Sequence, residues 1–146
     1  MIYKERPANF NPRFEVVSCV LEHEGKFLLL HRHDHKPQGN TWCLPGGKAD
    51  AGEDLQTAIA REIFEETGYQ AVPNAYTASH SLLVSHDGYD FVYTVFSHVL
   101  PSPIEIQVEE AAHKGFRWVT LEEALSLPLM PDEDESIITF YQLRKS

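Results

Sequence analysis

The segment from Gly46 to Tyr69 constrains the fold and the chemistry of this chain more than any other stretch. Apolar residues recur at helical spacing over 54–67 and a glycine follows as a natural C-terminal cap, so a helix is predicted there. Glu62, Glu65 and Glu66 stand at positions i, i+3 and i+4, which places three carboxylates on one helix face. Like charges at this spacing destabilise a helix by roughly 0.2–0.5 kcal/mol per pair. The three carboxylates therefore need a positive charge close to them.

A hard divalent cation relieves this repulsion most simply. Mg²⁺ suits the site best, with Mn²⁺ as an alternative, because Mg²⁺ takes carboxylate and water oxygens and shares them with substrate phosphates. Gly46 and Gly47 bring bare backbone next to the helix start, where a carbonyl can reach the metal without a side chain in the way. Arg61 lies four residues before Glu65 and can pair with Glu65 or with Glu53, orienting the ligands.

Length and charge limit the remaining functions. A chain of 146 residues with 42% hydrophobic content is sufficient for one domain, predicted over residues 1–146. A net charge of −10 argues against a general nucleic-acid or anionic-membrane binder, although a metal ion can still bring an anion to an acidic protein. Neither a signal-like segment nor a run of membrane-spanning length is present, so a cytoplasmic location is expected. Cys19 and Cys43 lie in apolar stretches and are expected to be reduced and buried.

Strand patterns and helix patterns interleave along the chain. Strands are predicted at 14–23, 26–32 and 115–121, and two more lie within 75–100 around an Asp-Gly turn. Short helices are predicted at 121–127 and 131–145, the second started by Pro131 and Asp132, whereas Pro45-Gly46-Gly47 should break regular structure. This order favours an α/β or α+β layered sandwich with a mixed sheet.

Residues at fixed spacing in the segment from Gly46 to Tyr69 carry a family resemblance. These are Gly47, Glu53, Arg61-Glu62, Glu65-Glu66 and Gly68, and together they closely resemble the signature of the Nudix hydrolases, called the box below. Tyr69 departs from it, since the family usually has an aliphatic residue there. The resemblance implies an α/β fold, an α/β/α sandwich with a central mixed sheet, and Mg²⁺-dependent hydrolysis of a nucleoside diphosphate linked to another moiety.

The resemblance also assigns roles to residues. Glu62, Glu65 and Glu66 carry over as metal ligands together with the Gly46 carbonyl, and Glu53 and Arg61 as orienting partners. The general base is left open between a box glutamate and an acid outside the box. Many relatives have a glutamate six residues before the tryptophan that is Trp118 here, but Ala112 occupies that position. The neighbouring Glu109, Glu110 and His113 are the alternatives, and Glu110 is taken as a further metal ligand, although surface charges are an equally good reading of both glutamates.

The expected substrate is a small nucleotide, in the first place a nucleoside triphosphate or a modified nucleotide. ADP-ribose, nucleotide sugars, dinucleoside polyphosphates and a non-catalytic nucleotide-binding role remain alternatives. Arg32 and Lys48 are candidates for phosphate binding, against the simpler interpretation as solvated charges. The candidates for stacking on a base are Phe14, Tyr76, Phe91 and Trp42, although aromatic residues in strands are mostly core residues. The acidic run 132–135 favours a helix N-terminus or, alternatively, reads a base edge. Dimers are common among members of the family, so a homodimer is compatible with the resemblance.

Overall fold

A mixed eight-stranded sheet forms the centre of the computed structural model, which describes residues 1–145. The strands are β1 (Ile2–Tyr3), β2 (Pro12–His23), β3 (Lys26–Arg32), β4 (Trp42–Cys43), β5 (Gly46–Lys48), β6 (Thr77–His86), β7 (Tyr89–Val99) and β8 (His113–Val119). Their order is β1-β6-β7-β2-β3-β4, with β5 paired to β2 and β8 paired to β3. Only the β2–β7 pairing is parallel within the described residues, so the sheet is mixed as predicted.

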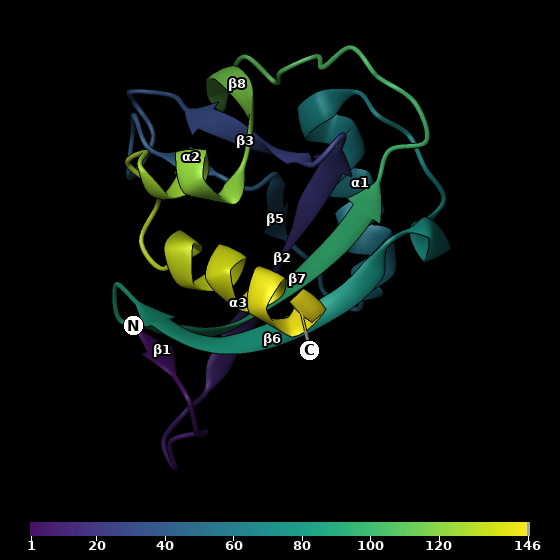
Figure 1. Cartoon of the computed structure of the whole chain (residues 1–146). Coiled ribbons are helices and arrows are strands. Elements are labelled where there is room, and N and C mark those ends of the chain that lie inside the picture. Colours follow the sequence, from purple (N-terminus) through teal and green to yellow (C-terminus); the bar gives the residue numbers. More distant parts are fainter. Residues whose placement is uncertain (146) are drawn as a thin grey trace.

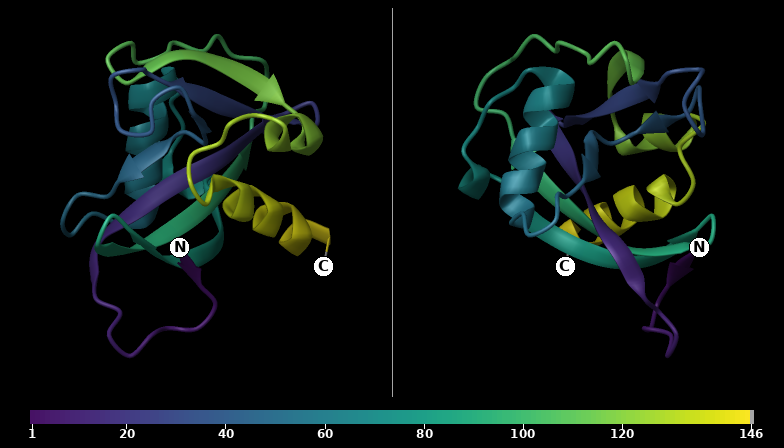
Figure 2. Two further views of the ribbon diagram at one scale, coloured as in Figure 1. Left: turned by 90° about the vertical axis from the view of Figure 1, so that its left-hand side faces the viewer. Right: turned by 180° about the vertical axis from the view of Figure 1, so that it is seen from behind.

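Helices cover both faces of this sheet. Helix α1 (Leu55–Thr67) lies on one face, and α2 (Leu121–Leu125) and α3 (Glu133–Lys145) lie on the other, as Figure 1 and Figure 2 show. A short 3₁₀ turn, η1 (Pro73–Ala75), leads from α1 towards β6. Two apolar clusters fill the layers, one built around Ile59 and Ile63 of α1 and the other around Ile137 and Phe140 of α3. The predicted α/β/α sandwich is confirmed.

The middle of β2 explains why one strand can serve both layers. Its residues from Val17 to Leu21 are all buried, and successive side chains point to opposite faces of a sheet. Cys19 therefore packs in the α1 cluster, and Val20 packs in the α3 cluster. A continuous apolar run of this kind is typical of a strand covered on both sides. Strand β2 thus fixes α1 and α3 relative to one another.

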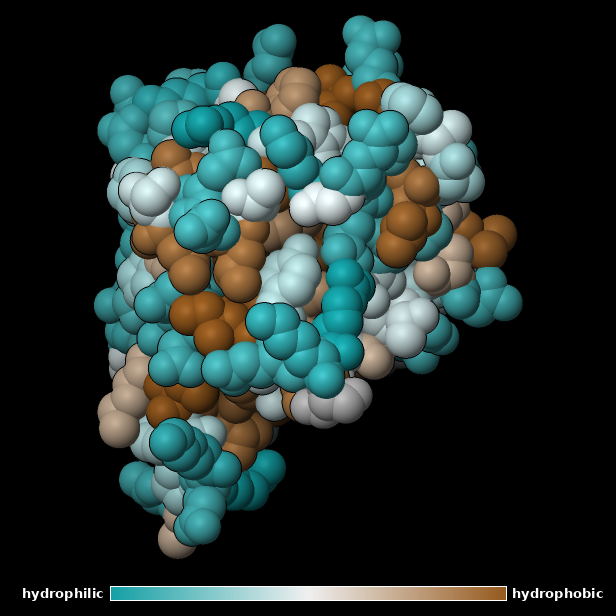
Figure 3. All heavy atoms as spheres, in the orientation of Figure 1, coloured by the Kyte–Doolittle hydropathy of each residue, from teal (hydrophilic) through white to brown (hydrophobic). Residues whose placement is uncertain are grey.

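Several local predictions hold. The turn between β6 and β7 has positive φ at both Asp87 (53°) and Gly88 (79°), as a two-residue hairpin of this type requires. Cys19 and Cys43 are free and buried. None of the helices in residues 1–145 is long and apolar enough to span a membrane. The face that carries α2 and α3 is a mixture of hydrophilic and hydrophobic residues (Figure 3).

Two local predictions are wrong. Gly46-Gly47 does not break regular structure but forms β5 with Lys48, antiparallel to β2. A Cβ at Gly46 would lie 2.1 Å from the Val17 carbonyl oxygen, so the glycine permits a close strand pairing. Pro131 and Asp132 precede α3, which begins at Glu133, because Asp132 has a left-handed backbone with φ of 68°.

Candidate active site

Helix α1 is fixed in its rotation by local caps and by packing. Asp54 accepts a hydrogen bond from the Thr57 amide at 3.3 Å, and Gly68, with φ of 81°, ends the helix. Ile59 and Ile63 are fully buried against the sheet. This rotation decides how far each glutamate of the box is exposed. The side chains are 13% exposed for Glu62, 44% for Glu65 and 10% for Glu66.

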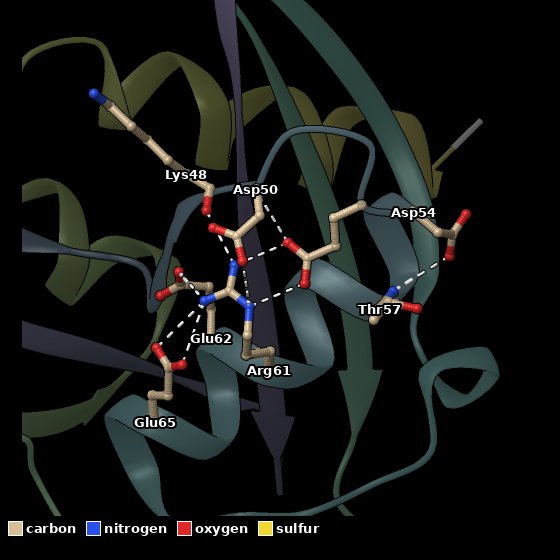
Figure 4. Close-up of polar contacts among 8 residues, drawn as sticks. Lys48, Asp50, Asp54, Thr57, Arg61, Glu62 and Glu65 are labelled. Carbon is tan, nitrogen blue, oxygen red and sulfur yellow. Dashed lines mark hydrogen bonds and ion pairs between the residues drawn. The ribbon is translucent and has the colours of Figure 1, made fainter.

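Arg61 connects the carboxylates of the box, as Figure 4 shows. Its Nε and one terminal nitrogen donate to the two oxygens of Glu53, at 2.9 and 3.0 Å. The other terminal nitrogen donates to Glu62 at 2.9 Å and lies 3.4 Å from Glu65. Arg61 therefore pairs with both predicted partners. Because a guanidinium is planar and rigid, the arrangement holds Glu62 in a defined position.

The strand β5 brings bare backbone against these carboxylates. The Gly46 amide donates to Glu66 at 2.6 Å. A Cβ at Gly47 would lie 2.6 Å from the Glu62 carboxyl carbon, so only glycine leaves room for this carboxylate. The loop and the helix, separate in sequence, are thus in direct contact at two carboxylates.

Burial raises the pKa values of the two least exposed box carboxylates, Glu62 and Glu66. The pKa of Glu66 is raised well above its ordinary value, first by burial and then by the charges of Glu62, Glu109 and Glu65. The pKa of Glu62 is also raised, mainly by burial. Glu53 behaves in the opposite way, since its hydrogen bonds from Arg61 lower its pKa to about 2.

These observations fit a divalent cation. Two desolvated carboxylates that repel one another are stabilised as anions by a positive ion. In residues 1–145, no three His, Cys, Asp or Glu side chains are already arranged as a metal cluster, and Arg61 bridges Glu62 and Glu65. Of the box glutamates, Glu66 lines the cavity beside the box, and the carboxylate of Glu62 lies against Gly47.

The three candidates outside the box, Glu109, Glu110 and His113, lie in different surroundings. Glu109 influences the pKa values of both Glu62 and Glu66. Glu110 is exposed and lies in a neighbouring hollow with His33, His113 and Lys114, so this hollow is where the predicted extra ligand stands. His113 is buried, its Nδ1 lies 3.7 Å from a Glu66 oxygen, and burial together with Arg32 lowers its pKa to about 4.

A cavity of about 250 Å³ opens beside the box. Glu66, Gly46 and Gly47 line it together with Arg32, and the opposite lining includes aromatic and acidic residues: Phe91, Tyr93, Asp132 and Glu133. Glu133 is 4% exposed and accepts hydrogen bonds from the Leu44 amide at 2.6 Å and the Tyr93 hydroxyl at 2.8 Å. Burial raises its pKa to about 7.

The predicted substrate residues fall in three different places. Arg32 lines the cavity, and its Nε donates to the Pro37 carbonyl. Lys48 points away from the carboxylates (Figure 4), and its amine lies 4.2 Å from the ring centre of Phe14, beside an open hollow next to the box loop. Tyr76 is fully buried in the α1 cluster, and the described pockets do not include it. Of the predicted substrate residues, Arg32 and Phe91 line the cavity.

The family model described as NUDIX domain matches residues 12–140 of the chain. This chain belongs to the Nudix hydrolase family. Members of the family generally use a divalent metal ion and act on small nucleotide substrates. The family predicted from the box is therefore confirmed, and the roles of the individual box residues stay predictions.

Named relatives and a solved structure agree with this assignment. The chain is 34% identical to a CTP pyrophosphohydrolase of Escherichia coli K12 over 130 residues, covering 89% of this Nudix chain and 93% of the relative. It is also 34% identical over 110 residues to the phosphatase NudJ of Escherichia coli K12, covering 75% and 69% of the two chains. The crystal structure of a MutT protein from Methanosarcina mazei Go1 superposes with a TM-score of 0.74 at 25% identity, covering 92% and 94% of the chains.

The sequence predicts part of the cavity wall of this Nudix protein, including Arg32 and Phe91, but not the contact between Tyr93 and Glu133. Tyr93 reads as an ordinary strand residue, and Glu133 was considered only within an acidic run at a helix start. Ser18 lies close to Tyr93, but its buried hydroxyl has no partner of hydrogen-bond geometry. The sequence signals for this wall are Phe91, an aromatic strand residue that can stack on a base, and the acidic run 132–135, which predicts either a helix start or a contact with a base edge.

Proposed function

We propose that this chain is a Mg²⁺-dependent pyrophosphohydrolase of a nucleoside triphosphate, with the base held in the cavity beside the box. The observation that carries the proposal is that one cavity is lined both by the acidic residues of the box region and by aromatic residues that can hold a base. Glu66, Gly46 and Gly47 supply the acidic half, and Phe91, Tyr93 and Glu133 supply an aromatic half with buried polar groups. A pocket of this composition is the usual form of a small-molecule site.

The two halves are connected through one short backbone segment. The Leu44 amide donates to Glu133, and the Gly46 amide donates to Glu66. The two carboxylates are therefore both held by backbone amides of the short segment from Leu44 to Gly46. This supports a single ligand that reaches from the metal-binding side to Glu133.

The roles of the residues follow from their contacts. A divalent cation shared by Glu62, Glu66 and the pyrophosphate oxygens would cancel charge and lower the pKa of attacking water. Gly46 holds one oxygen of Glu66, and Arg61 positions Glu62. Arg32, on the cavity wall, offers a fixed guanidinium to a phosphate oxygen.

We propose that Glu65 and the Gly46 carbonyl complete the cation site. The proton of the attacking water passes to one of the neighbouring carboxylates. Outside the box, Glu109 is a better candidate than Glu110, because the charge of Glu109 acts on Glu66 whereas Glu110 lies in the neighbouring hollow. Mn²⁺ is expected to replace Mg²⁺, because both take oxygen ligands in octahedral geometry.

The acidic side chains of the cavity favour a base with an exocyclic amino group. Asp132 and Glu133 both line the cavity, and carboxylate oxygens accept the hydrogens of an amino group such as that of cytosine. The similarity to a CTP pyrophosphohydrolase over 89% of this chain supports the same choice. Cytidine triphosphate and its modified forms are therefore the first substrates to test. A nucleotide substrate also favours a cytoplasmic location, and sedimentation would decide the homodimer expected from the resemblance.

The test is a panel of nucleotides assayed with Mg²⁺ and with Mn²⁺. It contains CTP, UTP, ATP, GTP, ADP-ribose, a nucleotide sugar and a dinucleoside polyphosphate, each with wild-type protein and with Glu66→Gln. The proposal predicts turnover of nucleoside triphosphates, highest for CTP, and nearly complete loss in Glu66→Gln with an unchanged circular-dichroism spectrum. Turnover of ADP-ribose alone would move the substrate assignment, and absence of any turnover would support a non-catalytic nucleotide-binding module.

A further inference from the structure

We propose that His113 is a positioning residue for Glu66, with its Nδ1–H fixing the carboxylate oxygen that Gly46 leaves free. The proposal rests on the assignment of Glu66 as a metal ligand in the preceding section. It adds a residue outside the box that acts on the cation site through Glu66.

The first observation is a buried ring nitrogen without a hydrogen-bond partner. His113 is 3% exposed, and its Nδ1 has no hydrogen-bond partner although it lies 3.7 Å from Glu66 Oε2. Buried polar atoms normally have a partner, so an isolated ring nitrogen beside a buried carboxylate needs an explanation. A closer approach of under about 1 Å brings the two atoms to hydrogen-bond distance.

The second observation is the division of labour between the two oxygens of Glu66. Oε1 accepts the Gly46 amide at 2.6 Å, whereas Oε2 faces the imidazole ring of His113. With donors on both oxygens, the plane of the carboxylate is defined, and the remaining lone pairs point into the cavity. Ligating carboxylates are commonly hydrogen-bonded in this way.

The third observation is that the backbone is built to aim this ring. The pairing of β3 with β8 is regular from Phe27 to His31 and then shifts, so that Arg32 stands opposite His113 and one extra residue, Lys114, is accommodated in β8. Without this bulge, Lys114 would face the same direction, because a one-residue slip exchanges the two faces of a strand.

The position is held firmly on both sides. The His113 amide donates to the Glu109 carbonyl at 2.9 Å, and the Ala112 carbonyl accepts from the His33 amide at 2.9 Å. Ala112 itself has no acidic side chain to offer to the site. In this chain, therefore, the ring of His113 is the polar group that the start of β8 presents to Glu66.

Substitutions that move the donor distinguish positioning from packing. The amide nitrogen of asparagine can occupy the place of Nδ1, that of glutamine the place of Nε2, and leucine fills the space without a donor. The variants His113→Asn, His113→Gln and His113→Leu therefore test which atom matters. Mn²⁺ alone is the probe, and its dissociation constant is measured by calorimetry without nucleotide, beside kcat and KM for the best substrate of the panel.

The proposal predicts that His113→Asn keeps the Mn²⁺ dissociation constant and kcat within about threefold of wild type. His113→Gln and His113→Leu should weaken Mn²⁺ binding and lower kcat by about 10-fold or more, with KM little changed. In a Glu66→Gln background, His113→Leu should have no further effect on Mn²⁺ binding.

Wild-type Mn²⁺ affinity in His113→Leu, or an equal loss in all three variants, would overturn the positioning role. If Glu66→Gln alone leaves Mn²⁺ affinity unchanged, the assignment of Glu66 as a ligand fails instead, so the two failures are distinguishable. Unfolding temperatures without metal identify a variant that is merely unstable, and the Asn and Gln variants, similar in polarity, then decide the question between them.

Discussion

Replacing Gly47 by alanine tests the geometry of the acidic site most selectively. The new Cβ would lie 2.6 Å from the carboxyl carbon of Glu62 and 2.6–2.7 Å from its two oxygens. Ordinary contact begins at 3.4 Å, so the carboxylate must retreat by about 0.8 Å. Metal–ligand distances tolerate only about 0.2 Å, and a displacement of about 1 Å costs about 100-fold in rate. We expect kcat/KM to fall about 100-fold, or about 2.7 kcal/mol of transition-state stabilisation.

The fold should tolerate the same change. The φ of Gly47 lies outside the left-handed region, and the clash involves the end of a flexible side chain, so the free energy of unfolding should fall by about 1 kcal/mol or less. Gly115→Ala is the matched control, since a Cβ there meets no atom within 4 Å. The assays are steady-state kinetics over a Mg²⁺ titration and thermal unfolding without metal. If Gly47→Ala keeps kcat/KM within threefold of wild type, the placement of Glu62 does not matter and the reasoning is refuted.

Other substitutions test the remaining contacts. Glu133 has a pKa of about 7 against an ordinary value of 4.5, so the folded chain holds this proton more tightly than the unfolded chain. The stability that protonated Glu133 contributes is present at low pH and is lost as pH rises from about 4.5 to 7, by at most about 3 kcal/mol. Chemical unfolding gives the free energy of unfolding as a function of pH, and Glu133→Gln should flatten this part of the wild-type curve. Arg61→Lys keeps the charge but loses the two-pronged contact with Glu53, so the Mg²⁺ concentration for half-maximal activity should rise about 10-fold; an unchanged midpoint would remove Arg61 from the orienting role. The buried hydroxyl of Tyr76 has no partner, so Tyr76→Phe should leave thermal stability equal or higher and KM unchanged, and a raised KM would instead restore Tyr76 as a substrate contact. CTP should be hydrolysed with a kcat/KM about 10-fold above that for UTP, because UTP offers no amino group to Glu133.

The acidic helix could be predicted from sequence because its signals are local. Helical spacing and a C-terminal glycine both act within a few residues, and the structure has this helix from Leu55 to Thr67, with Asp54 as its N-terminal cap. The pairing of Arg61 with Glu53 and Glu65 also follows from helix geometry and a short loop.

The course of the chain outside the box could not be predicted in this way. The segment between β7 and β8 has little regular structure, and it is docked by long-range contacts such as the hydrogen bond from the Gln107 amide to the Thr67 carbonyl, 2.8 Å. These contacts place Glu109 near the carboxylates and Glu110 in the neighbouring hollow. Sequence spacing alone treats the two glutamates as equivalent.

The cavity wall depends on pairings between distant segments. Tyr93 reaches the cavity because β7 runs parallel to β2, a pairing between strands more than seventy residues apart, and it meets Glu133 from the start of α3. Similarly, Tyr76 and Phe14 are both aromatic residues in or near strands, but one is fully buried and the other lines a different hollow. Alternation along a strand does not reveal which face will border a ligand.

The most direct test of the central claim is the identity of the products formed from CTP with Mg²⁺, followed by phosphorus NMR. We expect CMP and pyrophosphate from the wild-type protein and no change in the CTP spectrum with Glu66→Gln. Release of CDP and inorganic phosphate, or equal turnover by Glu66→Gln, would contradict it.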